Sequence, residues 1–329
     1  MALLTITKAI NEAHRIVMRE DPNVFVIGED VARYGGVYKV TEGLLQEFGK
    51  SRVRDTPISE AAIAGAGVGA ALVGAKPIVE IGFVDFVGTC FDQIVNQAAK
   101  YRYLSGGKAS VPMVFRMTTG TVGLGYGVHH SQSLEAWFAH TPGLKVVMPS
   151  NAADAKGLFI AAVDDPDPVI FLEHKNLYQQ KSEVPEGRHV VPLGVASICR
   201  QGEDVTIVAW SQAVNWAVTA AKRVSESHGI SCEVIDLRSL VPLDEAAVLA
   251  SVRKTGRVII CHEACRTGGF GAELSARVAE NALDWLDAPP LRITAPDIPV
   301  ASCVPLEEVY LRPRHLLPEA ILHICNRSQ

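Results

Sequence analysis

The sequence predicts an α/β protein of two domains with mostly parallel sheets, and three observations lead to this fold class. Short apolar runs of strand length alternate with longer stretches whose apolar residues recur at helical spacing. The chain has 329 residues, too many for one typical domain and suited to two of about 150. A polar, proline-containing stretch at 174–192 interrupts the alternation near the middle. Strands that alternate with helices are typical of a parallel sheet covered on both faces.

The first half of the chain begins with a helix, expected over residues 7–19, because apolar residues recur there every three or four positions. A second helix, expected over residues 61–74, is rich in glycine and alanine and so permits close approach of another backbone. The other expected elements are a strand at 24–27, a strand at 77–81, a helix at 86–103, a strand at 111–115, a helix at 132–140, a strand at 145–148, a helix at 152–163 and a strand at 169–172.

The alternation restarts after the polar stretch. We expect strands at 205–210, 232–235, 258–261 and 291–293, helices at 213–225, 244–253 and 271–283, and a last helix at 306–324 that two prolines interrupt. The sequence therefore predicts one domain over residues 1–175, a linker over residues 176–192 and a second domain over residues 193–329.

Composition and missing motifs exclude several classes of function. The net charge of −5 gives no broad basic face, which argues against nucleic acid as a partner. Seven scattered cysteines without a Cys-x-x-Cys pair are typical of free thiols. No P-loop and no Gly-x-Ser-x-Gly elbow occur, and the glycine run at 65–69 lacks the spacing and context of a dinucleotide site.

The same survey gives an expectation for the compartment. The longest apolar uncharged stretch, residues 61–75, is too short and too rich in glycine to span a bilayer, so no membrane contact is expected. The N-terminal residues do not have the layout of a signal peptide, because Lys8, Glu12 and Arg15 interrupt the apolar positions. We therefore expect a protein of the bacterial cytoplasm or of an organelle matrix.

Several motifs stand in a characteristic order along most of the chain. They are DTPISE at 55–60, DQIVNQAAK at 92–100, SGG at 105–107, HHSQSLEAWFAHTPGLKVVMPS at 129–150, DAKGL at 154–158 and TGGFGAE at 267–273. In this order the sequence resembles the beta subunit of the thiamine diphosphate-dependent component of 2-oxo acid dehydrogenase complexes. The resemblance runs from about residue 3 to beyond residue 300, so it is far more specific than any single motif.

The resemblance implies a fold and partners. It implies a pyrimidine-binding domain followed by a transketolase C-terminal-type domain, in an enzyme that is active only with its alpha subunit, as two alpha and two beta chains. The alpha subunit holds Mg²⁺ and the cofactor's diphosphate, which fits the absence here of a Gly-Asp-Gly motif followed by paired asparagines. The second partner that it implies is the lipoyl acyltransferase of the complex.

The implied reaction is the oxidative decarboxylation of a 2-oxo acid, with pyruvate favoured, and transfer of the acyl group to lipoamide. Acetoin and branched-chain 2-oxo acids are alternative substrates, because the resemblance implies a pocket that is shared with the alpha subunit. Two further alternatives are a split transketolase-like enzyme and a non-catalytic assembly subunit. Retention of Glu60, Phe86 and His130 together argues against the non-catalytic alternative.

Glu60 is the first candidate for a catalytic residue. The aminopyrimidine of thiamine removes the thiazolium C2 proton through its imino tautomer, and a carboxyl group bonded to the ring nitrogen stabilises that tautomer by exchanging a proton. Such a carboxyl needs apolar surroundings, and Glu60 precedes Ala61, Ala62 and Ile63. The alternative is an acid that only favours the start of a helix, next to a cap such as Ser59.

Three other residues of the first domain match positions of the family. Phe86 is implied to pack on the aminopyrimidine face, although it also suits an ordinary core. Glu29 is implied to contact the cofactor and, together with Asp92, to line a polar channel between two active sites. Acidic residues at strand ends are also frequent turn formers, so this alternative stays open.

The adjacent His129 and His130 offer a second catalytic candidate. The family places its catalytic histidine directly before Ser-Gln, which is His130 here, and His129 remains a candidate for substrate contact. An imidazole near neutrality can stabilise charge on the substrate or give a proton to the dithiolane of lipoamide. A zinc site is not expected, because no ligand stands at i+4 from either histidine.

Two further features follow from the resemblance. It suggests K⁺ bound by main-chain carbonyls, which leave no side-chain signature in a sequence; the implied residues are Met113, Ala162, Val163, Asp165 and Asp167. The stretch EACRTGGFG at 263–271 matches a family signature, and we interpret it as packing or docking rather than chemistry.

Overall fold

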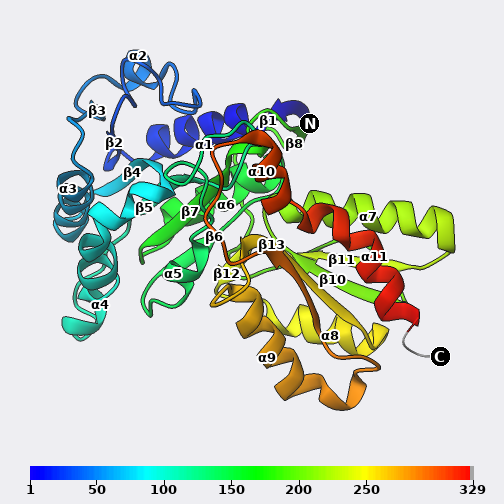
Figure 1. Cartoon of the computed structure of the whole chain (residues 1–329). Coiled ribbons are helices and arrows are strands. Elements are labelled where there is room, and N and C mark those ends of the chain that lie inside the picture. Colours follow the sequence, from blue (N-terminus) through cyan, green and yellow to red (C-terminus); the bar gives the residue numbers. More distant parts are fainter. Residues whose placement is uncertain (327–329) are drawn as a thin grey trace. The chain divides into compact units, whose positions relative to one another are not determined.

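The computed structural model describes residues 1–326 and shows an α/β chain that divides into two compact units (Figure 1). The first unit consists of residues Met1–Thr119 and Trp137–Leu193. The second contains Gly120–Ala136 together with the chain from Gly194 onward. The expected fold class is confirmed. The short segment at 120–136 therefore belongs with the C-terminal half, although it lies between two elements of the N-terminal half.

The first unit is built on parallel strands in the order β6-β7-β5-β4-β2-β3. Most of their residues are buried, as expected for a parallel sheet covered on both faces. In chain order the strands are β2 (Val24–Gly28), β3 (Val53–Asp55), β4 (Lys76–Phe83), β5 (Val114–Thr119), β6 (Lys145–Val147) and β7 (Val169–His174).

Helices α1 (Ile6–Glu20) and α6 (Ala152–Asp164) pack against each other in the first unit (Figure 1). Helix α1 begins where expected, because the Thr5 side chain accepts a hydrogen bond from the Lys8 N–H and caps the helix. Helix α3 (Glu60–Leu72) packs on β4, and Gly67 lets it approach closely: a Cβ there would lie 2.5 Å from Val79 Cγ2. A short helix, α2, covers Leu44–Phe48.

Three expected elements differ from the structure. The helix expected at 86–103 is broken into a 3₁₀ helix η1 (Val84–Thr89), a π-helix η2 (Gln93–Ala98) and the short α4 (Tyr101–Leu104). The carboxylate of Asp92 accepts side-chain amide bonds from the η2 turns that follow it, and such local bonds compete with regular helical geometry.

Strand β5 begins at Val114 rather than at residue 111, because Pro112 has no N–H for a ladder bond. Helix α5 covers only Glu135–Ala139. Its expected start at Gln132 is instead extended, and the Gln132 carbonyl accepts a bond from the Gly120 N–H at 2.9 Å. Strands β1 (Ala2–Thr5) and β8 (Lys181–Val184) pair antiparallel and were not expected.

The second unit has the strand order β14-β13-β10-β11-β9, in which only β9 runs antiparallel to its neighbour. Its strands are β9 (Ser197–Arg200), β10 (Val205–Ala209), β11 (Cys232–Asp236), β12 (Ser239–Val241), β13 (Val258–Cys265) and β14 (Leu291–Ala295). Its helices are α7 (Gln212–His228), α8 (Glu245–Thr255), α9 (Phe270–Ala282), η4 (Leu283–Trp285), α10 (Val304–Tyr310) and α11 (Pro313–Asn326). Pro313 opens α11 because the first helical residue needs no N–H partner.

Arg116 is the centre of a buried charge network in the first unit. From β5 its guanidinium binds Glu80 on β4 and Glu173 on β7, with 2.8 Å between Nη2 and Glu173 Oε2. Tyr178 donates its hydroxyl to the same Glu173 oxygen at 2.8 Å. Arg116, Glu173 and Tyr178 are at most 2% exposed. One cation thus serves two buried carboxylates and joins three neighbouring strands.

Two expectations about cysteines and membranes can be compared with the structure. The seven cysteines, which all lie within residues 1–326, form no disulfide there. No helix within residues 1–326 combines the length and apolar character needed to cross a membrane.

Removing the cation at the centre of this network should strongly destabilise the first unit. We expect Arg116→Met to lower the free energy of unfolding by about 3–5 kcal/mol, because two buried carboxylates lose their counter-charge. The measurement is urea denaturation. Arg277→Met is the control: its ion pairs with Glu245 and Glu273 are partly exposed, and its cost should stay below about 1 kcal/mol. Equal costs for the two variants would contradict this account of the network.

Candidate functional site

The candidate site of the first unit lies at the carboxyl ends of β2, β3 and β4. The chain leaves β2 toward β3 on one side and leaves β4 toward β5 on the other. Connections that diverge from two adjacent parallel strands leave a crevice at the carboxyl edge, where ligands of open α/β sheets bind. Glu29 directly follows β2, Glu60 follows β3 after a short loop, and Phe86 follows β4. The topology thus brings three of the predicted residues to one edge.

Glu60 is the first residue of α3, as expected for either interpretation of it. The Ser59 side chain makes no capping bond. The Glu60 side chain is half-buried, and its Oε2 accepts a hydrogen bond from the Thr89 hydroxyl at 3.3 Å. Ala61 and Ala62, expected to enclose it, are exposed in this chain. The apolar surroundings of Glu60 are therefore incomplete within the described residues.

Phe86 lies near Glu60 through Thr89. The Thr89 hydroxyl is 2.8 Å from the Phe86 carbonyl as well as within bonding distance of Glu60. The half-buried Phe86 ring meets Phe83 edge-on, with ring centroids 5.7 Å apart. Thr89 was not predicted as a site residue, since only the 3₁₀ turn of η1 places it between the other two.

Glu29 and Glu60 influence each other electrostatically. Partial burial raises the pKa of Glu29 above its usual value, and the negative charges of Glu60 and Asp30 raise it further. Burial, with a contribution from Glu60, also raises the pKa of the Cys90 thiol to about 12. The Cys90 thiol is therefore neutral near pH 7. The negative charge of Glu60 thus makes the Glu29 carboxyl easier to protonate than an ordinary glutamate.

Asp92, the other acid of the expected channel, has local partners. Its carboxylate accepts bonds from Asn96 Nδ2 at 2.7 Å and from Gln97 Nε2 at 3.3 Å. Gln93, which also bonds to Asp92, lies beside α3: its Oε1 is 3.3 Å from the Cβ position of Gly65. Asp92 is thus close to the helix that Glu60 begins, and the described contacts do not join it to Glu29.

His129 and His130 lie in the segment Gly120–Ala136, which clusters with the second unit. The His130 N–H closes a turn onto the Gly127 carbonyl at 3.2 Å. His129 is exposed and His130 is half-buried. Within residues 1–326 no group of three or more His, Cys, Asp or Glu side chains is arranged so that it could hold a metal ion.

A cavity of about 480 Å³ opens in the second unit just after this histidine pair. Gln132 and Ser133 line it from the histidine segment, and Cys265, Asp297 and Tyr310 are among the residues opposite. The wall at Asp297 is rigid, because its carboxylate accepts both the N–H and the hydroxyl of Thr267, at 2.8 and 2.7 Å. The histidine segment therefore borders a formed cavity.

At the expected potassium site, the carboxylates of Asp165 and Asp167 are already paired with cationic side chains. The Lys145 ammonium lies 2.6 Å from each oxygen of Asp165, and Arg102 binds Asp167. The Met113 carbonyl accepts the Val169 N–H at 3.0 Å. Ala162 and Val163 fall in the last turn of α6, where carbonyls lack intrahelical donors. A cation here would have only main-chain carbonyls to bind.

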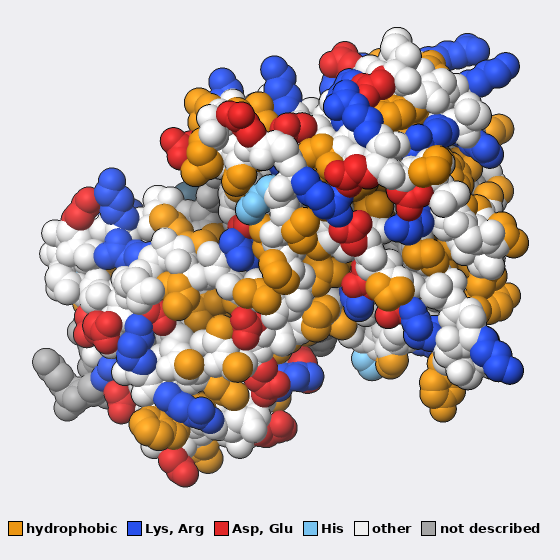
Figure 2. Space-filling model, turned by 180° about the vertical axis from the view of Figure 1, so that it is seen from behind, with side chains coloured by type: hydrophobic (Ala, Val, Ile, Leu, Met, Phe, Trp, Pro, Cys, Tyr) orange, Lys and Arg blue, Asp and Glu red, His pale blue; other side chains and the backbone are white. Residues whose placement is uncertain are grey.

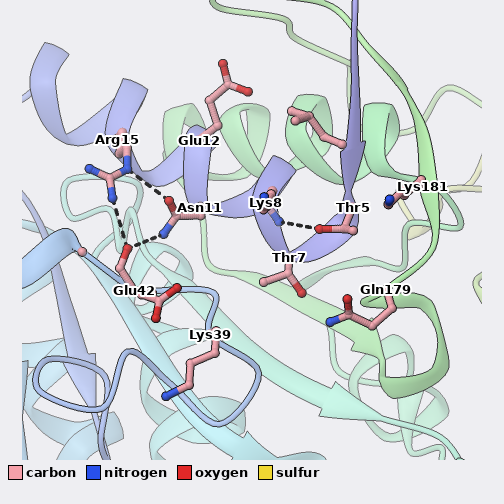
Figure 3. Close-up of a pocket in the computed structure, with 12 residues that line it drawn as sticks. Thr5, Thr7, Lys8, Asn11, Glu12, Arg15, Lys39, Glu42, Gln179 and Lys181 are labelled. Carbon is pink, nitrogen blue, oxygen red and sulfur yellow. Dashed lines mark hydrogen bonds between the residues drawn. The ribbon is translucent and has the colours of Figure 1, made fainter.

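Another cavity, of about 780 Å³, lies in the first unit and contains none of the predicted residues (Figure 3). Figure 3 shows Asn11 and Arg15 of α1 directed at the Glu42 carbonyl, to which they donate at 3.0 and 3.1 Å. Asn11 also donates to the Val40 carbonyl at 2.8 Å. Lys39 donates to the Tyr34 carbonyl at 2.6 Å. Of the cations that line this cavity, Arg15 thus joins the neighbouring loop to α1, and Lys39 bonds within that loop.

The outer face of α3 is apolar and uncovered in this chain. Ala61, Ala62 and Ala66 are exposed on it, and Ile58 and Val73 at its two ends are 82% and 86% exposed. Apolar side chains also gather between charged ones on the face shown in Figure 2. Exposed contiguous apolar surface is typical of a site of protein association.

Comparison with known proteins gives a consistent result. The transketolase pyrimidine-binding domain matches residues 3–181, and the transketolase C-terminal domain matches residues 194–314. The acetoin:2,6-dichlorophenolindophenol oxidoreductase subunit beta of Bacillus subtilis is 50% identical over 94% of this chain and 93% of its own length. The 2-oxoisovalerate dehydrogenase subunit beta of the same species is 46% identical, covering 94% of each chain.

Two other comparisons extend this result. The pyruvate dehydrogenase E1 component subunit beta of Rhizobium meliloti is 46% identical over 99% of this chain and 70% of its own length. Among solved structures, a split-gene transketolase described as an inactive beta4 tetramer matches with a TM-score of 0.80, 22% identity and full coverage of both chains. This structural likeness shows the fold alone.

Proposed function

The chain belongs to the transketolase-type family that includes the beta subunits of pyruvate, acetoin and 2-oxoisovalerate dehydrogenases, and from this premise we propose that it is such a beta subunit. The proposed activity is oxidative decarboxylation of a 2-oxo acid, with pyruvate favoured, followed by acyl transfer to the lipoamide of a partner acyltransferase. The observation that carries the proposal is the likeness to these subunits along nearly the whole chain. The convergence of Glu29, Glu60 and Phe86 at one sheet edge supports it.

Thiamine diphosphate fits the residues at this edge. When bound, it supplies the carbon nucleophile that the cleavage of a 2-oxo acid requires. Glu60 would hold or move a proton at the aminopyrimidine nitrogen, and the raised pKa of its neighbour Glu29 indicates that the region accepts a proton. The half-buried Phe86 ring would cover the pyrimidine face, and Thr89 would orient the Glu60 carboxylate.

The other half of the cofactor site would come from an alpha subunit. We propose that this partner holds Mg²⁺ and the diphosphate, in an assembly of two alpha and two beta chains. Glu60 is the first residue of α3, and the exposed apolar face of this helix would be covered in that assembly. The covering subunit would complete the apolar surroundings of Glu60. Asp92, at the adjoining turn, would line a polar channel with Glu29.

Further parts of the proposal rest on fewer observations. His130 would act as an acid toward the dithiolane of lipoamide or stabilise charge on the substrate, with His129 in contact with substrate. K⁺ would be bound by the main-chain carbonyls of residues 113, 162, 163, 165 and 167. The bacterial and mitochondrial relatives fit a location in the cytoplasm or an organelle matrix.

Acetoin is the second candidate substrate, because the acetoin-oxidising relative is 50% identical to this chain and the other two relatives are 46% identical. The test is co-expression with the candidate alpha chain and a dye-coupled screen of pyruvate, branched-chain 2-oxo acids and acetoin. Turnover of a 2-oxo acid with dye reduction supports the proposal. Turnover of acetoin alone would reassign the substrate, and no turnover of any would contradict the activity.

The isolated chain should not bind thiamine diphosphate tightly, because the predicted magnesium and diphosphate ligands belong to the partner. Calorimetry should show binding only after the alpha chain is added. Ala66→Glu, on the exposed face of α3, should prevent assembly, whereas Ala276→Glu, at an exposed position of α9, should not. Micromolar binding of the cofactor by the isolated chain would contradict this expectation.

Glu60→Gln should leave the assembly folded, because the amide oxygen can still accept the Thr89 hydroxyl. It should slow exchange of the C2 hydrogen of bound cofactor by about 100-fold or more, as expected when a proton-transfer partner is lost. Hydrogen–deuterium quench experiments measure this rate. Glu183→Gln, an exposed position on β8, is the control and should exchange at the wild-type rate. An unchanged rate of C2 hydrogen exchange in Glu60→Gln would mean that Glu60 only favours the start of α3 and takes no part in proton transfer.

His130→Ala should separate the two half-reactions. Acyl transfer to lipoamide needs a proton at the departing dithiolane sulfur, whereas reduction of a dye does not. If His130 supplies that proton, the variant keeps much of its dye-coupled activity and loses most acylation of a lipoyl domain. His129→Ala should be milder in both assays. Small and equal effects of the two substitutions would mean that neither histidine is catalytic.

A further inference from the structure

Helix α10 contains two glutamates and buries one of them, Glu307, together with Tyr310, while three of its apolar residues stay exposed, unlike the usual pattern for a surface helix. Glu307 is 0% exposed, while Val304, Leu306 and Val309 are 45–58% exposed. Burying a carboxylate is costly unless hydrogen-bond donors compensate it. The face that α10 turns inward therefore carries a carboxylate, Glu307, beside the buried Tyr310.

Glu307 binds the backbone of the histidine segment. Its Oε1 accepts the Gly123 N–H at 3.0 Å and its Oε2 accepts the Gly125 N–H at 2.6 Å. Each carboxylate oxygen thus accepts one backbone N–H, and neither N–H belongs to a helix or strand. Hydrogen bonds from N–H groups to a charged acceptor are stronger than those to a neutral one.

A second carboxylate holds the two ends of the segment. Glu263, at the end of β13, is 7% exposed and accepts the Thr121 N–H at 2.6 Å and the Ser133 hydroxyl at 3.4 Å. Further along, Glu135 accepts the indole N–H of the buried Trp210 at 3.2 Å. The two histidines lie between Thr121 and Ser133, so Glu263 holds the segment on both sides of the histidine pair.

Two glycines bring the segment against the loop that precedes α10. Gly125 and Gly127 have φ of +74° and +76°, which only glycine adopts readily. A Cβ at Gly125 would lie 2.8 Å from the Ser302 carbonyl oxygen, and one at Gly127 would lie 2.2 Å from Ser302 Oγ. The backbone of the segment therefore approaches Ser302 so closely that no side chain would fit between them, just before His129 and His130 in the chain.

From this geometry we propose that Glu307 is a positioning residue for the His129–His130 pair. It touches no reacting group. It fixes the glycine loop through the Gly123 and Gly125 N–H groups, and the loop in turn sets the position of the imidazoles. The part of this inference that concerns catalysis rests on the proposed function, whereas the part that concerns the loop does not.

The test compares Glu307→Gln with Glu308→Gln in the assembled complex. A glutamine has one oxygen for two N–H donors, and its NH₂ group would face the second donor. Glu308 is the matched control, since it is the next residue of α10 and pairs with Arg314 instead. We expect amide hydrogen exchange at 120–127 to become about tenfold faster or more in Glu307→Gln only, because a charged acceptor is lost.

Two functional readouts accompany this measurement. The rate at which diethyl pyrocarbonate modifies His130 should change in Glu307→Gln and not in Glu308→Gln. This measurement needs no substrate, so it does not depend on which substrate the enzyme uses. Acylation of a lipoyl domain should fall about tenfold in kcat with an unchanged thermal midpoint, as a displaced proton donor predicts. Unchanged loop exchange, or faster exchange with unchanged histidine reactivity, would overturn the positioning role. Failure of the proposed function would appear separately, as a wild-type complex without 2-oxo acid turnover.

Discussion

The single guanidinium of Arg116 is the constraint on which the first unit depends. It neutralises Glu80 and Glu173 within the sheet and so ties β4 and β7 to β5. The Glu80 carboxylate also lies close to the loop after β2, where a Cβ at Gly36 would be 3.3 Å from its Oε1. The buried charges thus lie in the strand that leads to Phe86 and next to the loop that begins with Glu29.

The candidate site follows from this frame through the order of the strands. Parallel strands end at one edge, and the divergence of the chain at β2 and β4 opens that edge to a ligand. Glu60 and Glu29 lie at that edge, and the negative charge of Glu60 helps to raise the pKa of Glu29. Within the described residues the outer face of α3 has no cover, and it is on this observation that we propose a second subunit completes the surroundings of Glu60.

The sequence was sufficient for features that depend on local pattern or on the order of motifs. Buried strands such as β2 and β7 are short apolar runs, and Glu60 could be placed at a helix start from DTPISE alone. It was not sufficient for contacts between distant residues. Thr89 joins Glu60 to Phe86 only because η1 is a 3₁₀ turn, and Glu307 binds a loop 184 residues earlier in the chain. Pro112 delays β5 through a missing N–H, a local effect that the apolar run concealed.

The central claim is that this chain is half of an enzyme that transfers an acyl group to lipoamide. Mass spectrometry of a lipoyl domain, after incubation with the co-expressed alpha and beta chains, thiamine diphosphate, Mg²⁺ and a 2-oxo acid, tests it most directly. The account predicts one added acyl group whose mass changes with the 2-oxo acid supplied and which is absent when either chain is left out. An unmodified lipoyl domain, with ketol transfer between sugar phosphates by the same preparation, would contradict it and identify a split transketolase.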